Sequence, residues 1–156
     1  MAKVTKSTLP DRSQLHALVA EADFLDCYEV ESKLSVRDAA EIALEFSGWT
    51  EALLALRNII VAPFGLATSG PEDAEVIGIF PVVSESKDEL VVGFDDSHLN
   101  FRIGVLSNEG SIYLATWVHP NNVGGRMYLG LVMPFHILIV RNALQRVARK
   151  SCLVCR

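Results

Sequence analysis

Between Glu75 and Val132 the chain is a run of short extended segments separated by polar turns, and this run limits the folds open to it. Apolar and polar residues alternate most clearly from Leu99 to Leu106, as in a strand with one buried face. Consecutive short strands joined by tight turns predict an antiparallel meander. A sheet of this kind has an apolar face that another element must cover.

We expect one early strand and five strands in this run. Phe24, Tyr28 and Val30 suit a half-buried extended surface, which predicts the early strand from Asp23 to Val30. The first strand of the run can also be read as two strands bent at Pro81. The five expected strands are Glu75 to Val83, Glu89 to Phe94, Leu99 to Leu106, Ser111 to His119 and Arg126 to Val132.

Helical patterns precede and follow the strands. Ser35 and Asp38 can form a capping box, which predicts a helix over 35–47. Residues 11–19 can form a short helix. A second helix carries Trp49, Leu53, Leu56 and Ile60 on one stripe, and the last begins at Pro134 and carries Ile137, Val140, Leu144 and Val147 at spacings of three and four.

Length and composition predict one globular domain over 1–156, with loose tails at 1–10 and 151–156. Half of the 156 residues are hydrophobic, so the chain can bury a core. The net charge is −5, which is unfavourable for nonspecific binding to nucleic acid or anionic membranes. The longest apolar stretch, Tyr128 to Val140, is shorter than a bilayer span, and no secretory signal is recognisable. We therefore expect a cytoplasmic protein with no membrane span and with reduced thiols.

The element order predicts an α+β fold in which a curved antiparallel sheet wraps around a long C-terminal helix. This order resembles the START-like helix-grip superfamily. Locally the chain resembles a bacterial family of domains of unknown function (DUF2867-like), over roughly residues 10 to 150. The segments that carry this resemblance are 54–58, 63–66, 94–102, 124–129 and 134–136.

The resemblance implies a fold and a cavity between the closing helix and the sheet, but no reaction and no cofactor. Ligand cavities are mostly apolar, with a few polar groups that orient the ligand. We expect an apolar or amphipathic small molecule there. The polar candidates are Arg57, His98, Arg102, His119, Tyr128 and His136, and Trp117 would supply apolar surface.

The register of the hairpin near residue 109 decides which candidates meet. A two-residue turn at 108–109 would set His98 opposite His119 and keep the apolar residues of both strands on one face. A three-residue loop with Gly110 in the left-handed region would pair Leu99 with His119. Glu is unfavourable in a primed turn, which favours the loop, but we expect the first register because it buries one continuous face.

Several candidates have a structural alternative. Arg57 can bind a ligand carboxylate or pair with Asp23, Asp26 or Glu51. His136 at a helix start would be neutral and could act as a base, or could cap the backbone. Tyr128 can point into a cavity or into solvent. Two facing histidines lack the ligand number that zinc prefers, so we expect no metal.

The three cysteines give no clear site. Cys152 and Cys155 form a C-x-x-C pattern after a basic helix end, whereas a redox motif needs its first Cys at a helix N-terminus. Cys27 suits the core of its strand. No nucleotide-binding, hydrolase or metalloprotease motif occurs.

The sequence leaves three functions open. The first is binding of a small molecule without turnover, with Arg57, His98, Tyr128 and His136 orienting it. The second is a cyclase- or hydratase-type enzyme with His136 or His98 as general acid and base. The third is an interaction module or homodimer, with Tyr113 and Trp117 on the outer face of the sheet.

Overall fold

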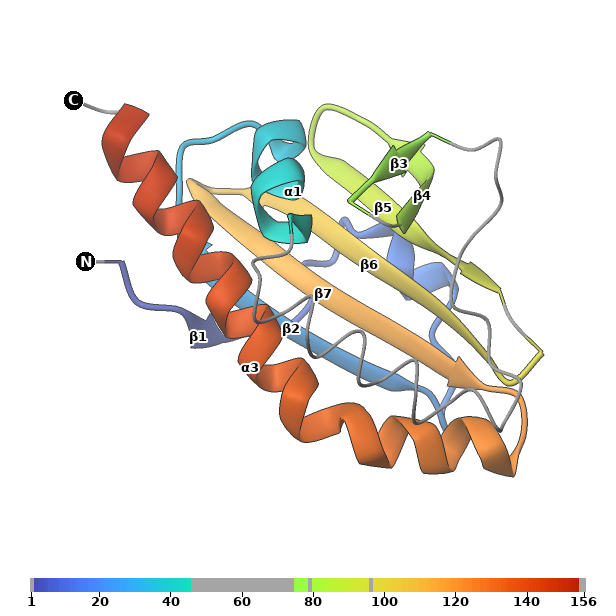
Figure 1. Cartoon of the computed structure of the whole chain (residues 1–156). Coiled ribbons are helices and arrows are strands. Elements are labelled where there is room, and N and C mark those ends of the chain that lie inside the picture. The colour runs from blue at the N-terminus through green and yellow to red at the C-terminus, as the bar shows by residue number, and fades with distance from the viewer. Residues whose placement is uncertain (1, 46–74, 79, 96, 155–156) are drawn as a thin grey trace.

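The computed structural model describes residues 2–45, 75–78, 80–95 and 97–154, and it shows an α+β fold (Figure 1). The predicted second helix, with Trp49 and Arg57, lies outside the described residues. The elements are β1 (Thr5–Lys6), the 3-10 helix η1 (Gln14–Ala17), β2 (Phe24–Glu31), α1 (Val36–Leu44), β3 (Val76–Ile77), β4 (Phe80–Glu85), β5 (Glu89–Asp95), β6 (Leu99–Asn108), β7 (Ser111–Pro120) and α3 (Val123–Val154).

The strands form one antiparallel sheet in the order β1-β2-β7-β6-β5-β4-β3. From β3 to β7 it is the predicted meander. Strand β2 returns beside β7 and pairs with it from Phe24 opposite Val118 to Glu31 opposite Ser111. The two neighbours of β7 are therefore β6 and β2, so its edges are filled.

One face of the sheet is covered by α1 and α3, as Figure 1 shows. Side chains of a strand alternate between faces, so every second residue of each strand meets these helices. The core on this face combines Tyr28, Val30, Leu90, Val92, Val105, Ile112 and Leu114 from the strands with Ala39, Ala43, Val140, Leu144 and Val147 from the helices.

The other face is covered by the N-terminal segment, although residues 1–10 were expected to be loose. Leu9 and Leu15 pack there on Cys27 and Trp117. The buried carboxylate of Glu89 accepts hydrogen bonds from the Ser13 hydroxyl (2.7 Å) and the backbone N–H of residue 14 (3.0 Å). Parts of both expected tails have regular structure, since β1 pairs with β2 and α3 continues to Val154, whereas residues 1 and 155–156 lie outside the described residues.

The predicted strand from Arg126 to Val132 is wrong, because this segment is part of α3. A short apolar run does not distinguish a strand from a buried helix by its pattern alone. The sheet decides between them here, since both edges of β7 are already paired. A strand directly after β7 would have no adjacent place in the sheet.

The start of α3 is set by Asn122 and Gly125. The side-chain oxygen of Asn122 accepts the Gly125 N–H at 3.0 Å, as an N-cap residue does. A Cβ on Gly125 would lie 2.1 Å from the His98 carbonyl oxygen, so only glycine allows the helix to begin this close to the sheet. Pro134 lies inside the helix, not at its start, and the bend of α3 in Figure 1 agrees with a proline inside a helix.

By length and composition α3 could cross a membrane, and it is the one helix of the described residues that could. The sequence had predicted no membrane span, because its longest apolar stretch, Tyr128 to Val140, is shorter than a bilayer span. The helix α3 extends beyond this stretch at both ends. Core helices of water-soluble proteins pass the same test, so this property alone assigns no location.

The hairpin has neither of the two expected registers. Asn108 pairs with Ser111, which makes Glu109-Gly110 a two-residue turn and sets His119 opposite Asn100. The register is shifted by two from the preferred one, so the predicted faces are correct although the partners are not. Both turn residues have positive φ, 49° for Glu109 and 82° for Gly110, as a type I′ turn requires.

The segment expected as one strand or two is two, β3 and β4. The break is at Gly78, which has φ 64°, and not at Pro81, which lies inside β4. Proline is tolerated in an outer strand of a sheet, where it removes few ladder hydrogen bonds.

The turn predicts a stabilising substitution. Glu109→Asn should raise the free energy of unfolding by about 0.5–1 kcal/mol, because Asn adopts positive φ at lower cost. Chemical denaturation of the variant measures this. Glu21→Asn is the control, since Glu109 is the one non-glycine residue of the described chain with positive φ. A Glu109 variant no more stable than this control would contradict the turn assignment.

The two halves of α3 predict a matched pair of variants. Leu144→Ala should lower the free energy of unfolding by about 2–5 kcal/mol, because Leu144 is fully buried between α3 and the sheet. Leu138→Ala should change it by less than about 0.5 kcal/mol, because Leu138 is 59% exposed. Equal losses in the two denaturation curves would contradict this packing of α3.

Candidate functional site

Two aspartate–histidine pairs lie at the same end of the β2–β7 ladder. Asp26 of β2 meets His136 of α3, with 3.0 Å between Oδ2 and Nε2. Asp23, just before β2, meets His119 of β7, with 2.5 Å between Oδ1 and Nδ1. The first pair lies on the face covered by α3. The second lies on the opposite face, because His119 alternates with the residues that point toward α3.

The Asp26–His136 pair is largely buried. The Asp26 side chain is 6% exposed and that of His136 is 20% exposed. The second carboxylate oxygen of Asp26, Oδ1, is buried and has no hydrogen-bond partner among the residues that the structure describes. A buried carboxylate oxygen without a partner is costly, and such groups in native proteins are often functional.

The surroundings of this pair are apolar and aromatic. The ring of Phe24 meets the His136 ring edge-on, with 6.0 Å between centroids. Phe24 is opposite Val118, Val118 is opposite Phe101, and Phe101 is opposite Phe94, so these four residues form one row across the sheet. Asp26 lies one step inward from this row, opposite Thr116.

The Asp23–His119 pair has a buried acid and a partly exposed base. The Asp23 side chain is 1% exposed and that of His119 is 43% exposed. Asp23 also accepts hydrogen bonds from the indole N–H of Trp117 (2.9 Å) and the backbone N–H of Ala20 (2.8 Å). Burial raises the pKa of Asp23, but the hydrogen bonds from His119, Ala20 and Trp117 outweigh it and hold the pKa below its usual value.

His98 and His119 do not face each other. His98 lies at the start of α3, where Nδ2 of Asn122 is 3.0 Å from its Nδ1. The same Asn122 caps the helix. The expected pairing of the two histidines is therefore wrong because of the hairpin register. In the part of the chain that the structure describes, no group of three or more His, Cys, Asp and Glu residues could hold a metal ion.

The predicted ligand residues are not gathered in one place. Trp117 is buried on the face away from α3, packed with Leu9 and Leu15. The expected outer patch of Tyr113 and Trp117 is therefore covered by the N-terminal segment. Tyr128 and His136 both lie on half-buried positions of α3, two helical turns apart. Arg57 lies outside the described residues.

His136 does not lie at a helix start. The helix begins at Val123, so the N-terminal end of its dipole is more than three turns away. The predicted effect of the dipole on this imidazole is therefore wrong. Its environment is set by the Asp26 carboxylate and the Phe24 ring instead.

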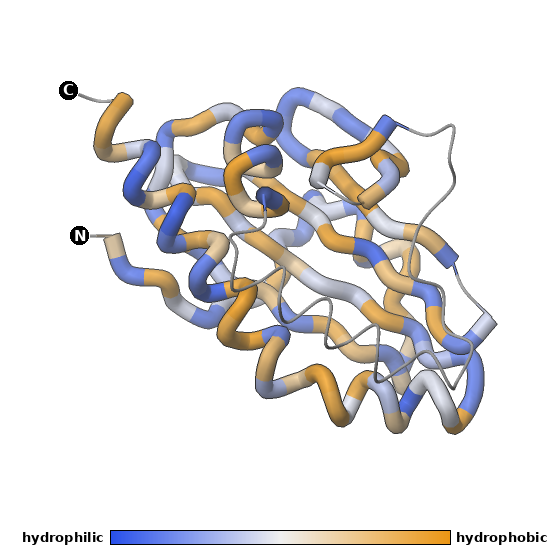
Figure 2. The backbone as a smooth tube through the Cα atoms, viewed as in Figure 1, coloured by the Kyte–Doolittle hydropathy of each residue, from blue (hydrophilic) through white to orange (hydrophobic). Residues whose placement is uncertain are grey.

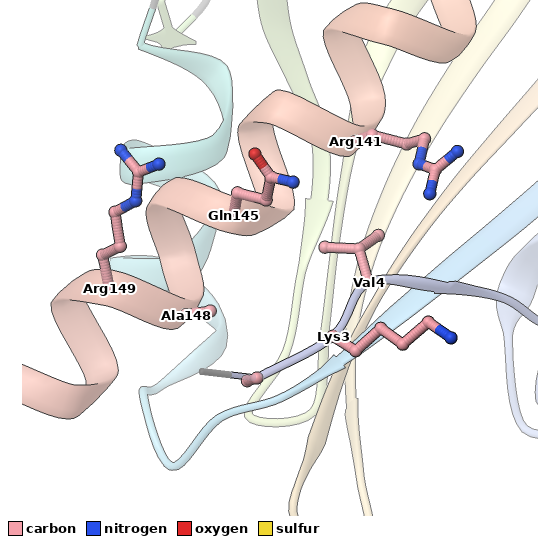
Figure 3. Close-up of a pocket in the computed structure, with 7 residues that line it drawn as sticks. Lys3, Val4, Arg141, Gln145, Ala148 and Arg149 are labelled. Atoms are coloured by element: carbon pink, nitrogen blue, oxygen red, sulfur yellow. The ribbon is translucent and has the colours of Figure 1, made fainter.

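A small cavity lies elsewhere, between the N-terminal segment and the C-terminal half of α3. Its volume is about 110 Å³, well below the several hundred Å³ of a typical ligand pocket. Figure 3 shows that the guanidinium groups of Arg141 and Arg149 point in different directions. They do not converge on one ligand position. The cavity is lined by Ala2, Lys3, Val4, Arg141, Gln145, Ala148 and Arg149.

The cysteines of the described residues contribute no reactive thiol to either aspartate–histidine pair. Cys27 is buried, as expected, and packs with Leu9, Leu15 and Trp117 on the face away from α3. Burial and the nearby charges of Asp26 and Glu29 raise the pKa of its thiol to about 12. Cys152 is exposed in the last turn of α3, and Cys155 lies outside the described residues.

The acidic partners are the residues that sequence analysis missed as site residues. Asp23 and Asp26 had been considered only as partners of Arg57. One signal was available, because Asp26 shares its strand face with Phe24, Tyr28 and Val30. An acidic residue at a core position is uncommon unless it has a partner or a function.

Comparison with known protein families gives a match over most of the chain. The profile of a family described as "Protein of unknown function (DUF2867)" matches residues 18–143. No curated protein matches the chain, and no solved structure does.

The hydrogen bonds of Asp23 predict a pH effect. Asp23→Asn should lower the free energy of unfolding at pH 7 by about 1–3 kcal/mol. Because the folded pKa lies below the usual 3.8, the contribution of Asp23 is present above 3.8 and is lost as the pH falls through the folded value. Denaturation curves at neutral and acidic pH measure both effects. If wild type and variant lost the same stability on acidification, Asp23 would not be the titrating group.

Proposed function

We propose that this chain, which belongs to the family of proteins of unknown function (DUF2867), binds a small apolar or amphipathic molecule on the α3 face of its sheet. The observation that carries the proposal is the buried Asp26 oxygen without a partner beside His136. Burial of this oxygen lowers the stability of the fold, because no hydrogen bond offsets the loss of water around it. A ligand that donates a hydrogen bond to it would remove that cost.

The surroundings narrow the chemical class of the ligand. The row Phe24, Val118, Phe101 and Phe94 offers an apolar wall across four strands, or about 14 Å at the usual strand spacing. Asp26 can only accept hydrogen bonds when it is ionised. The proposed ligand therefore has an apolar body and a hydroxyl or N–H group that reaches Asp26.

The proposed fold type is helix-grip, START-like. An antiparallel sheet with a long C-terminal helix on one face supports it. In this arrangement Asp26 and His136 lie between the helix and the sheet, where the sequence resemblance implies a cavity.

A second candidate is an enzyme with a histidine acid–base group. The Asp23–His119 pair favours it, because a buried carboxylate holds Nδ1 of an imidazole that is partly exposed. The acid–base group of this candidate is His119. The sequence had indicated His136 or His98 instead, but His98 contacts Asn122 at the start of α3. The test is hydration or cyclisation of an unsaturated substrate by wild type and by His119→Gln. Loss of this activity in the variant, with a melting curve like that of wild type, would support the enzyme.

Native mass spectrometry of gently purified protein is the first test of binding. A reproducible non-peptide mass that is lost on denaturation would support a ligand site and would identify the chemical class. A clean apo mass that persists after incubation with a panel of amphipathic alcohols would contradict the proposal.

The site predicts a specific loss of binding. Asp26→Asn should lower the retained ligand about tenfold or more, because it removes a charged acceptor while keeping the side-chain shape. The fraction of ligand-bound protein in native mass spectra measures the loss. Asp88→Asn is the matched control, since Asp88 is an exposed partner of Arg12. Equal occupancy in the two variants would exclude Asp26 as the anchor.

A further inference from the structure

The N-terminal half of α3 has a row of large apolar side chains on its outer surface. At 100° per residue they fall within about 120° of the helix circumference, so they form one stripe. Figure 2 shows mostly hydrophobic colour along this half of the helix, and more frequent hydrophilic segments in the other half before a hydrophobic last turn. The apolar stripe consists of Val123, Met127, Leu131, Phe135 and Leu138, all exposed.

The stripe is separate from the proposed ligand site. On a helical wheel His136 lies roughly opposite its centre, and it contacts Asp26 of the sheet. The stripe runs about 22 Å along the helix at 1.5 Å per residue. Isolated exposed apolar residues are ordinary, but a continuous stripe of this length marks a contact surface.

The charged residues of α3 itself have a single sign. Residues 123–156 contain six Lys and Arg residues and no acidic residue, so residues 1–122 carry the remaining −5 − 6 = −11. Arg126 lies at one end of the stripe, and Arg141, Arg149 and Lys150 follow its other end, all exposed. The net charge of the whole chain, which had argued against anionic surfaces, conceals this separation.

The helix is held to the domain by its other half. Val140, Leu144 and Val147 are buried in the core. The guanidinium group of Arg146 donates to the backbone carbonyls of Ala43 (3.1 Å) and Glu45 (2.6 Å) at the end of α1. A bilayer-spanning position would remove these contacts, so α3 fits a membrane surface better than a membrane interior.

We propose that the apolar stripe of α3 docks the protein on the surface of a membrane that contains anionic lipids. The stripe would enter the boundary between headgroups and acyl chains, as amphipathic helices with cationic flanks do. Arg126 and Arg141, at its two ends, would contact lipid phosphates. Figure 1 shows α3 along the outer edge of the fold, where it can meet a flat surface.

A second copy of the chain fits this surface less well. In a twofold dimer built on the stripe the two α3 helices would face each other. Whether they ran parallel or antiparallel, cations would meet cations, because α3 has no acidic residue. An anionic lipid surface supplies the opposite charge that a second α3 lacks.

The test is flotation of the full-length protein with vesicles of phosphatidylcholine alone or mixed with phosphatidylglycerol. We expect binding to the mixed vesicles that weakens as salt is raised. Leu131→Glu should lower the bound fraction about tenfold or more, because it places a carboxylate in the centre of the stripe. Leu18→Glu, the same change at another exposed leucine away from α3, should bind like wild type.

Two further results complete the test. Arg126→Gln combined with Arg141→Gln should lower binding to the mixed vesicles by about tenfold, since each exposed cation near an anionic surface contributes to binding. Melting curves of all variants should match wild type, because every substituted residue is exposed. Absence of vesicle binding would overturn the proposal. So would equal binding to both vesicle types, or a concentration-dependent dimer that Leu131→Glu dissociates without any binding to vesicles.

Discussion

The pairing of β2 with β7 is the constraint on which the rest of the structure depends. It joins residues 80 to 94 positions apart, from Glu31 with Ser111 to Phe24 with Val118. It fills the second edge of β7 and so sends the chain after residue 120 into a helix. It also brings Asp23 beside His119 and sets Asp26 beneath α3. Neither aspartate–histidine pair would exist without this ladder.

The two faces of the sheet use buried acids in different ways. On the face covered by the N-terminal segment, the oxygens of Glu89 are satisfied by hydroxyl and backbone donors, and those of Asp23 by imidazole, indole and backbone donors. Such acids fasten one element to another. On the α3 face, Asp26 has one satisfied oxygen and one without a partner. A buried oxygen without a partner adds a cost and no stabilisation, and this difference is the reason why we propose Asp26, and not Glu89 or Asp23, as the ligand anchor.

Much of the fold followed from local pattern, and the errors came from non-local contacts. Alternation over 99–106 predicted strand β6, the Ser35 cap predicted the start of α1, and face matching predicted which residues of β6 and β7 share a face, although not which residues pair. The turn at Glu109 was misjudged, because Glu is unfavourable at positive φ and pairing across the whole hairpin outweighs that cost. The segment 126–132 was misread because its pattern fits a strand or a helix, and only the occupied edges of β7 exclude the strand.

The candidate site was predicted less well than the fold. His136 was recognised, but its partner was not, because the register of β2 against β7 cannot be read from either segment alone. By itself the sequence determined the meander and the separation of charge between residues 1–122 and 123–156, since these depend on neighbouring residues and on composition. The closing helix was predicted only from Pro134 onward, whereas α3 begins at Val123. Only the tertiary structure decided which acid meets which histidine and which side of α3 stays exposed. Those outcomes depend on contacts between residues far apart in the chain, and the free energy of such contacts comes from burial that local sequence does not encode.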